Sequence, residues 1–181
     1  MKRLAIALLL FAIPLFAQYK MPPKEIADVV DAPPPPITTV SPDGKWVLLQ
    51  HIPALLTIED LSRPELKLAG IRFDPERHDQ SRALYATAMT LVRVADGESR
   101  AVSGLPANAR IRYTSWSPDV THLAAALSTA NGVELWAVDI ASARAHRLSS
   151  PPLNLTLPRR PFEWTPDSRA LIARTVPAAR A

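Results

Sequence analysis

The sequence predicts an all-β fold, and within that class an incomplete β-propeller of about two blades and part of a third. Three observations support this prediction. The chain of 181 residues has 19 prolines and only 5 glycines, and proline interrupts helices and central strands alike. A turn followed by a strand recurs three times, around Asp43, Asp119 and Asp167. The second and third copies, at 119 and 167, are 48 residues apart, a spacing typical of a four-stranded blade.

The repeated segment has a clear physical basis. Each copy begins with Ser or Thr followed by Pro and Asp, as at 41–43. Proline presets φ in a tight turn, and the aspartate carboxylate can accept hydrogen bonds from the backbone N–H groups that follow. The strands on either side should therefore pair as a hairpin. After the second turn, residues 123–127 are apolar without alternation, which favours a strand covered on both faces.

These recurrences divide residues 37–181 into three units. We expect blade one at 37–104, blade two at 107–150 and the start of blade three at 160–181. Blade one is long because it contains an insertion at 51–83. Within the insertion the sequence predicts, in order, a helical turn at 58–61, a strand at 65–73 and a charged loop at 76–82. Residues 40–49 are expected to form the first turn and the strand after it. The strands expected elsewhere lie at 84–94, 99–102, 110–116, 122–128, 133–140 and 145–148.

The N-terminal residues resemble an export signal. A short basic start is followed by an uncharged apolar run at 4–16, and Ala17 offers a small residue for cleavage. This pattern predicts a signal peptide at 1–17 and a periplasmic or secreted mature protein. A membrane anchor is the alternative, but the run is shorter than the roughly 20 residues a bilayer requires, so we expect no stable membrane span after cleavage. Residues 18–36 are expected to form a proline-rich strap, with at most one helical turn at 24–30.

Composition excludes several function classes. The chain has no cysteine, which rules out disulfides, cysteine nucleophiles and thiolate metal sites. Its formal charge of +4 belongs partly to the signal, because 19 basic and 17 acidic residues remain when Lys2 and Arg3 are removed with it. The remaining basic residues are scattered, whereas nucleic-acid binding favours a basic stripe interleaved with aromatic residues. We therefore expect no nucleic-acid partner.

No complete catalytic, cofactor or metal site is predicted. The segment 97–101 resembles the G-x-S-x-G pattern of a serine nucleophile, but it lacks the last glycine and follows an Asp-Gly hairpin signal. The recurring aspartates are interpreted as turn-forming residues, and no cofactor motif is present. The histidines are not spaced as zinc ligands; they are His51, His78, His122 and His146. The tryptophans are expected to fill the core between blades; they are Trp46, Trp116, Trp136 and Trp164.

Two segments are more specific than a generic propeller sequence. Residues 19–33 are YKMPPKEIADVVDAP, and residues 59–73 are EDLSRPELKLAGIRF. With the Ser-Pro-Asp repeats that follow, they resemble the start of the glutamyl endopeptidase branch of the prolyl oligopeptidase family of serine peptidases. The resemblance covers residues 19–175. It implies a β-propeller that restricts peptide access to a separate α/β-hydrolase domain with a Ser-Asp-His triad, and cleavage after acidic residues, chiefly glutamate.

The hydrolase domain that this resemblance implies is absent from the 181 residues. No catalytic residue of the family can be placed on this sequence, so the chain alone is expected to be inactive. We also expect residues 18–181 alone to be poorly soluble or partly unfolded, because a partial propeller exposes unpaired edges. Any peptide substrate would be bound through the missing domain. The alternative is a non-catalytic periplasmic propeller that binds protein partners. The sequence indicates neither the true substrate nor the oligomeric state.

Overall fold

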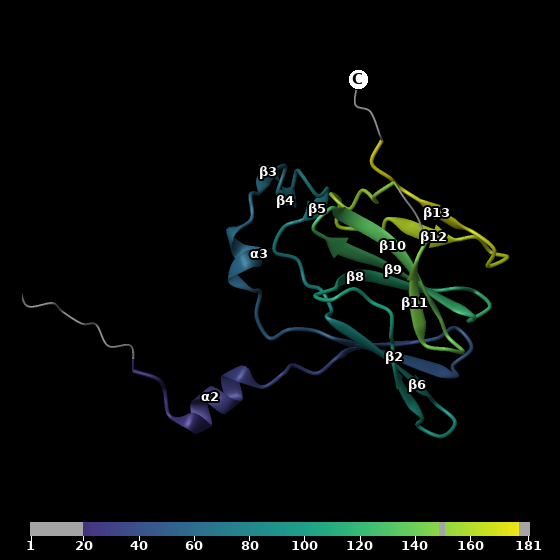
Figure 1. Ribbon diagram of the computed structural model, residues 1–181, viewed down its shortest axis with the longest axis horizontal. Helices are drawn as coiled ribbons and strands as arrows, with labels where there is room; N and C mark the ends of the chain where they lie inside the picture. The colour runs from purple at the N-terminus through teal and green to yellow at the C-terminus, as the bar shows by residue number, and fades with distance from the viewer. Residues whose placement is uncertain (1–19, 149–150, 178–181) are drawn as a thin grey trace, which may run out of the picture. The chain divides into compact units, whose positions relative to one another are not determined.

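The computed structural model describes residues 20–148 and 151–177. The expected signal peptide at 1–17 lies outside these residues, and so do the first two residues of the strap. The predicted all-β class is confirmed for these residues, since strands in antiparallel sheets dominate and the two helices among them are short (Figure 1). No helix in the described ranges is both long enough and apolar enough to cross a bilayer.

The first large sheet is a four-stranded antiparallel sheet in the order β1-β2-β6-β7. Its strands are β1 (Ile37–Val40), β2 (Trp46–His51), β6 (Ala88–Arg93) and β7 (Ser99–Ala101). The turn at 41–44 joins β1 to β2, and the Asp96-Gly97 turn joins β6 to β7. Both hairpins agree with the sequence prediction, although β6 begins four residues later than expected.

The second large sheet is a meander in the order β11-β10-β9-β8. Its strands are β8 (Arg110–Trp116), β9 (His122–Thr129), β10 (Gly132–Asp139) and β11 (Arg144–Arg147). The predicted hairpin is confirmed, but its turn lies at Ala130 and Asn131, one residue earlier than expected, because Gly132 already pairs with Thr129. A shorter hairpin follows, in which β12 (Phe162–Trp164) pairs with β13 (Leu171–Ala173) across the third copy of the turn.

Two apolar cores lie on opposite faces of the second sheet. One cluster joins Leu48 and Leu91 of the first sheet to Leu123 and Leu127 of β9. The other lies between alanines of the same strand β9 and the following segment, where Phe162 is buried. Strand β9 is thus covered on both sides, and its six central residues are all buried. This confirms the interpretation of the uninterrupted apolar run at 123–127 and explains it, since each face of the strand meets its own core.

The insertion between β2 and β6 differs in part from the prediction. The predicted helical turn is confirmed as α3 (Ile58–Ser62). The single strand expected at 65–73 is instead a hairpin of β3 (Leu66–Leu68) and β4 (Ile71–Asp74), because Ala69 and Gly70 both adopt positive φ. The expected loop at 76–82 contains the two-residue strand β5 (Asp79–Gln80), which pairs with β4.

The N-terminal segment is a separate unit that ends at Ala32, and only its internal structure is described. It contains the helix α2 (Lys24–Asp31), which has eight residues, so the expectation of a single turn was too short. Pro23 precedes the helix and Pro33 follows its end, and a residue that precedes proline is driven to extended backbone. An ion pair of 2.6 Å between Lys24 Nζ and Asp28 Oδ2 links successive turns.

The first and second sheets meet at an unusually close backbone approach. A Cβ atom placed on Gly104 would lie 2.5 Å from the carbonyl oxygen of Ala145. The residue before the glycine is held to the second sheet, because Ser103 N donates to Ala143 O at 2.9 Å and Ser103 O accepts from Ala145 N at 2.8 Å. Only glycine fits at 104 without moving the backbone of one sheet.

Candidate functional site

The three predicted aspartates build three equivalent turns. In the second copy, Ser117 Oγ donates to Asp119 Oδ1 at 2.7 Å, and the same carboxylate oxygen accepts from Thr121 N at 3.1 Å. His122 N donates to Ser117 Oγ at 3.0 Å. The other copies repeat this set of bonds around Asp43 and Asp167. Each carboxylate is therefore used by its own turn, which confirms the interpretation as turn-forming residues.

These bonds also lower the pKa of the aspartate in the turn. The hydrogen bond from Ser117, followed by that from the backbone N–H of Thr121, lowers the pKa of Asp119 to about 2. The side chain of Ser168, in the third turn, also lowers this pKa, though less than Ser117 and Thr121 do. In addition, the backbone N–H of Asp119 donates to Ser168 Oγ at 3.0 Å. The tip of the second turn is thereby bonded to the tip of the third.

The other singled-out residues have local roles. Ser99 begins β7 after an ordinary hairpin turn, so the segment 97–101 is no nucleophile elbow. His51 Nε2 lies 3.1 Å from Thr90 Oγ1, and His122 Nδ1 lies 2.8 Å from Thr121 Oγ1. In the described residues, no three potential metal-ligating side chains gather at one place. The four tryptophans are partly buried and pack against the two apolar cores, as predicted.

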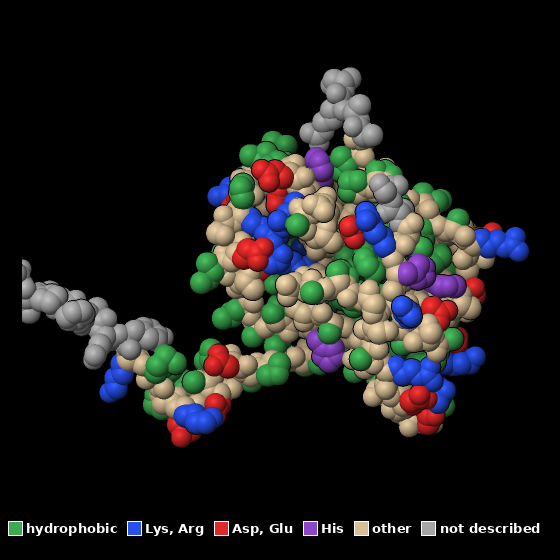
Figure 2. All heavy atoms as spheres, viewed as in Figure 1, with side chains coloured by type: hydrophobic (Ala, Val, Ile, Leu, Met, Phe, Trp, Pro, Cys, Tyr) green, Lys and Arg blue, Asp and Glu red, His purple; other side chains and the backbone are tan. Residues whose placement is uncertain are grey.

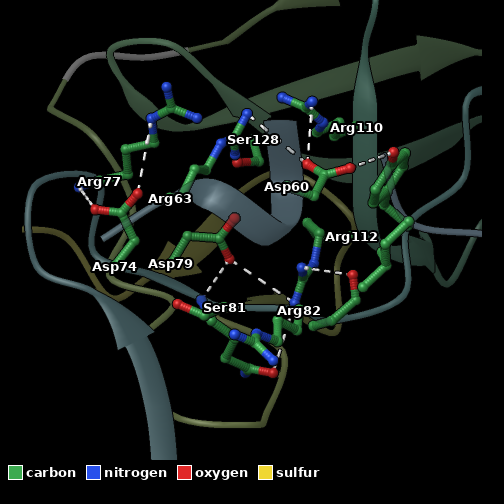
Figure 3. A pocket seen from close by; sticks show the side chains of 14 residues that line it. Asp60, Arg63, Asp74, Arg77, Asp79, Ser81, Arg82, Arg110, Arg112 and Ser128 are labelled. Carbon is green, nitrogen blue, oxygen red and sulfur yellow. Dashed lines mark hydrogen bonds and ion pairs between the residues drawn. The ribbon is translucent and has the colours of Figure 1, made fainter. Parts of the chain in front are cut away.

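The feature that sequence reasoning missed is a cluster of buried aspartates and partly buried arginines where the insertion meets β8. Figure 2 shows charged side chains gathered over this region, and Figure 3 shows the cluster from close by. We call it the Arg/Asp cluster. It consists of Asp60, Arg63, Asp74, Arg77, Asp79, Arg110 and Arg112.

Asp60 anchors one half of the Arg/Asp cluster. It lies in the first turn of α3, where Thr57 and Asp60 form a reciprocal capping box. Asp60 Oδ2 also accepts from the hydroxyl of Tyr85 at 2.8 Å, and Asp60 Oδ1 lies 3.0 Å from Arg110 Nη2 on β8. Burial raises the pKa of Asp60, but the hydrogen bonds from Thr57 and Tyr85 and the charge of Arg110 outweigh it and hold the pKa below its usual range.

The other half of the Arg/Asp cluster is centred on Arg112 of β8. The Arg112 side chain is only 5% exposed, yet its nearest carboxylate oxygen, Asp79 Oδ1, is 3.8 Å from Nη2. Its other polar contacts are equally long, at 3.4 Å to Ala83 O and 3.5 Å to Gln80 Oε1. Buried arginine is normally paired closely, so this guanidinium is poorly satisfied by protein atoms alone.

The Arg/Asp cluster ties the insertion to the second sheet and has no arrangement typical of a catalytic centre. Its acids are already engaged: Asp74 Oδ1 accepts from the backbone N–H groups of Glu76 and Arg77, and Asp79 Oδ1 accepts from Gln80 N. The capping box at 57–60 was the one local signal in the sequence. The partners on β8 could not be identified, because they lie about 50 residues further along the chain.

Comparison with known proteins places part of this chain among relatives of named peptidases. No protein-family profile matches the chain. It is 35% identical over 173 residues to a protein of Oryza sativa subsp. japonica named "Probable glutamyl endopeptidase, chloroplastic". It is 33% identical over 172 residues to a protein of the same name from Arabidopsis thaliana. Each match covers 90% of this chain and 18% of the relative. The chain is thus related to a part, under a fifth, of each plant protein.

A search of solved structures found a more distant likeness. A crystal structure from Bacteroides fragilis NCTC 9343, provisionally named a 6-phosphogluconolactonase, is 20% identical and has a TM-score of 0.37. The match covers 78% of this chain and 47% of that one. At that level of likeness it supports no inference about fold or activity.

Proposed function

We propose that residues 37–181 form part of a β-propeller, with successive blades at 37–104, 107–150 and 160–181. Three features support this proposal. The two large sheets follow the chain in sequence order apart from the insertion. They share an apolar core between facing sheets. The three equivalent turns occupy the same place in each unit, between its first and second strands. Radial repetition of four-stranded sheets is the propeller architecture.

The uncharged side chains on the outer face of the first sheet favour packing against a further sheet. The residues that alternate with the buried Leu48 and Leu91 are uncharged, and neither apolar core includes them. We call this surface the outer face; it consists of Thr38, Val40, Val47, Leu49, Thr90 and Val92. The relatives are more than five times as long as the matched segment, so a further sheet in a longer protein could cover this face.

We infer that the parent protein is an exported serine peptidase of the prolyl oligopeptidase family, cleaving after glutamate or other acidic residues. This chain would be the propeller part that restricts which peptides reach the catalytic domain. The relation to two proteins named as glutamyl endopeptidases over 90% of the chain carries this inference. The remaining candidate, a non-catalytic periplasmic binding module, is an outcome of the test below.

The test uses the native gene product, isolated with antibodies raised against residues 20–177. A peptidase parent predicts a product much larger than 181 residues that reacts with a fluorophosphonate probe for active serines. It should also hydrolyse a glutamyl chromogenic peptide, and the alanyl counterpart of that peptide serves as the matched control. A product of this chain's own length that neither reacts nor cleaves would refute the peptidase and favour the binding module.

Gating is tested by loosening the contact between sheets in the full-length enzyme. The variant Gly104→Ala disturbs the close approach to Ala145, whereas Gly97→Ala changes a glycine with open space around it. If the propeller restricts access, Gly104→Ala should increase cleavage of an unfolded protein substrate relative to a short glutamyl peptide. Equal ratios for Gly104→Ala, Gly97→Ala and the unaltered enzyme would contradict gating.

Export is tested separately. We propose that residues 1–17 are removed, so the mature protein should begin at Gln18. Mass spectrometry of the N-terminal peptide from the periplasmic or secreted fraction measures this directly. A product that retains Met1 in the cytoplasmic fraction would refute it.

A further inference from the structure

The Arg/Asp cluster surrounds a small cavity with an unusual chemical lining. The cavity has a volume of about 30 Å³. That is room for about two waters or one monatomic ion, since a water needs roughly 10–15 Å³. Five buried polar atoms on its lining residues have no hydrogen-bond partner within residues 20–148 and 151–177. They are Arg63 Nε, Arg77 Nη1, Arg112 Nε, Ser81 Oγ and Ser128 Oγ.

All five of these atoms can donate a hydrogen bond, and three belong to cations. None of the carboxylate oxygens of Asp60, Asp74 or Asp79 is among the buried atoms that lack a partner. The cavity therefore offers donors in excess of acceptors. Leaving a buried donor unsatisfied is costly, and the cost rises for charged groups. An occupant that only accepts hydrogen bonds matches this lining, whereas water would add two further donors of its own.

The burial of the donors distinguishes this cavity from an ordinary basic surface. The Arg112 side chain is 5% exposed, and Ser128 is 4% exposed on the central strand β9. Arg112 and Ser128 are fixed by neighbouring strands of one sheet, while Arg63, Arg77 and Ser81 come from the insertion (Figure 3). An occupant between them would join the insertion to the sheet.

We propose that this cavity binds one monatomic anion of chloride size. The anion would accept from the arginine N–H groups and from the hydroxyls of Ser81 and Ser128, and its charge would offset the arginines that have only long contacts. The small volume favours a monatomic anion over a sulfate, a phosphate or a peptide carboxylate. A surface hollow of about 510 Å³ borders the cavity, because Tyr85, Arg110 and Ser128 line both, and it offers a route for exchange with solvent.

The test measures stability of the purified chain against chloride concentration. Sodium gluconate keeps the ionic strength constant, so general screening by salt is unchanged. Binding to the folded state alone predicts a thermal midpoint that rises with the logarithm of chloride concentration above the dissociation constant. Bromide should act as chloride does, and an anomalous scattering peak from bromide should lie in the cavity of a crystal. An equal midpoint in chloride and gluconate, or a cavity holding only water, would overturn the proposal.

Substitutions in and away from the cavity keep the test decisive. Ser128→Ala removes one donor at little change in volume and should raise the chloride dissociation constant about tenfold, as expected for one hydrogen bond to a charged group. Ser99→Ala, at an exposed position on β7, should leave the chloride dependence unchanged. An unchanged chloride dependence in a folded Ser128→Ala protein would contradict the proposed site. Arg112→Met should abolish the dependence; if that variant does not fold, Ser81→Ala replaces it.

Discussion

The close approach at Gly104 predicts how strongly the contact between the two large sheets constrains the chain. Gly104 and Gly97 both have positive φ, +80° and +74°, so alanine at either site costs about 1–2 kcal/mol in the left-handed region. A gain of about 0.4–1 kcal/mol from the stiffer unfolded chain offsets part of this cost. We therefore expect Gly97→Ala to destabilise the protein by at most about 1.5 kcal/mol.

Gly104→Ala carries an additional cost that Gly97→Ala does not. Its Cβ atom would lie 2.5 Å from Ala145 O, whereas a Cβ on Gly97 meets no atom within 4 Å. The carbonyl cannot turn away freely, because Ala145 N is bonded to Ser103 O. Forcing a methyl group into a packed contact typically costs about 1–3 kcal/mol, so the total for Gly104→Ala should be about 2–4 kcal/mol.

The assay is urea unfolding followed by tryptophan fluorescence, since the four tryptophans pack against both apolar cores. The two variants are compared at the same low protein concentration. With a urea slope of about 1–3 kcal/mol per molar, the midpoint of Gly104→Ala should lie roughly 1 M below that of Gly97→Ala. Equal midpoints would refute the close approach, because positive φ would then account for the whole effect.

The turns, the carboxylates and the outer face each predict a further result. Ser117→Ala removes two hydrogen bonds of a buried hydroxyl and should lower the free energy of unfolding by about 1–3 kcal/mol in urea, with Ser99→Ala as a neutral control. Because the folded-state pKa of Asp119 is lowered from 3.8 to about 2, the stabilisation from its carboxylate is present above pH 3.8 and lost as the pH falls towards about 2. In the Asp119→Asn variant, the urea midpoint should therefore vary less with pH between those two values than it does in the unaltered protein. Val40→Lys, at the edge of the outer face, should raise the monomer fraction in analytical ultracentrifugation, whereas Ile58→Lys on α3 should not; equal effects would argue against association through this face.

Local chemistry made the turns and most strands predictable. The Ser-Pro-Asp turn at 117–119 is built from hydrogen bonds between residues at most five apart, so the sequence contains all its partners. The uninterrupted run in β9 also indicated cover on both faces, which the two cores provide. By contrast, the hairpin at 66–74 depends on a positive φ at Ala69, and alanine gives no sequence signal for that conformation.

The Arg/Asp cluster could not be predicted for a different reason. Asp60 meets Arg110, and Asp79 meets Arg112, only after the insertion has folded onto the edge strand β8. Before the fold is known, each of these residues resembles any other surface charge. The proline-bounded helix at 24–31 was underestimated for a simpler reason: its flanking prolines lie outside the eight helical residues and fix its ends.

The two large sheets are joined at opposite edges of the second sheet by different physical means. At its first strand, β8, Arg110 and Arg112 meet the acids of the insertion. At its last strand, β11, Ser103 forms a parallel bridge with Arg144, and Gly104 permits the contact. Apolar burial between the sheets supplies attraction without direction, so it allows them to slide. Hydrogen bonds and ion pairs at both edges remove that freedom, because each is satisfied in only one relative placement of the two sheets.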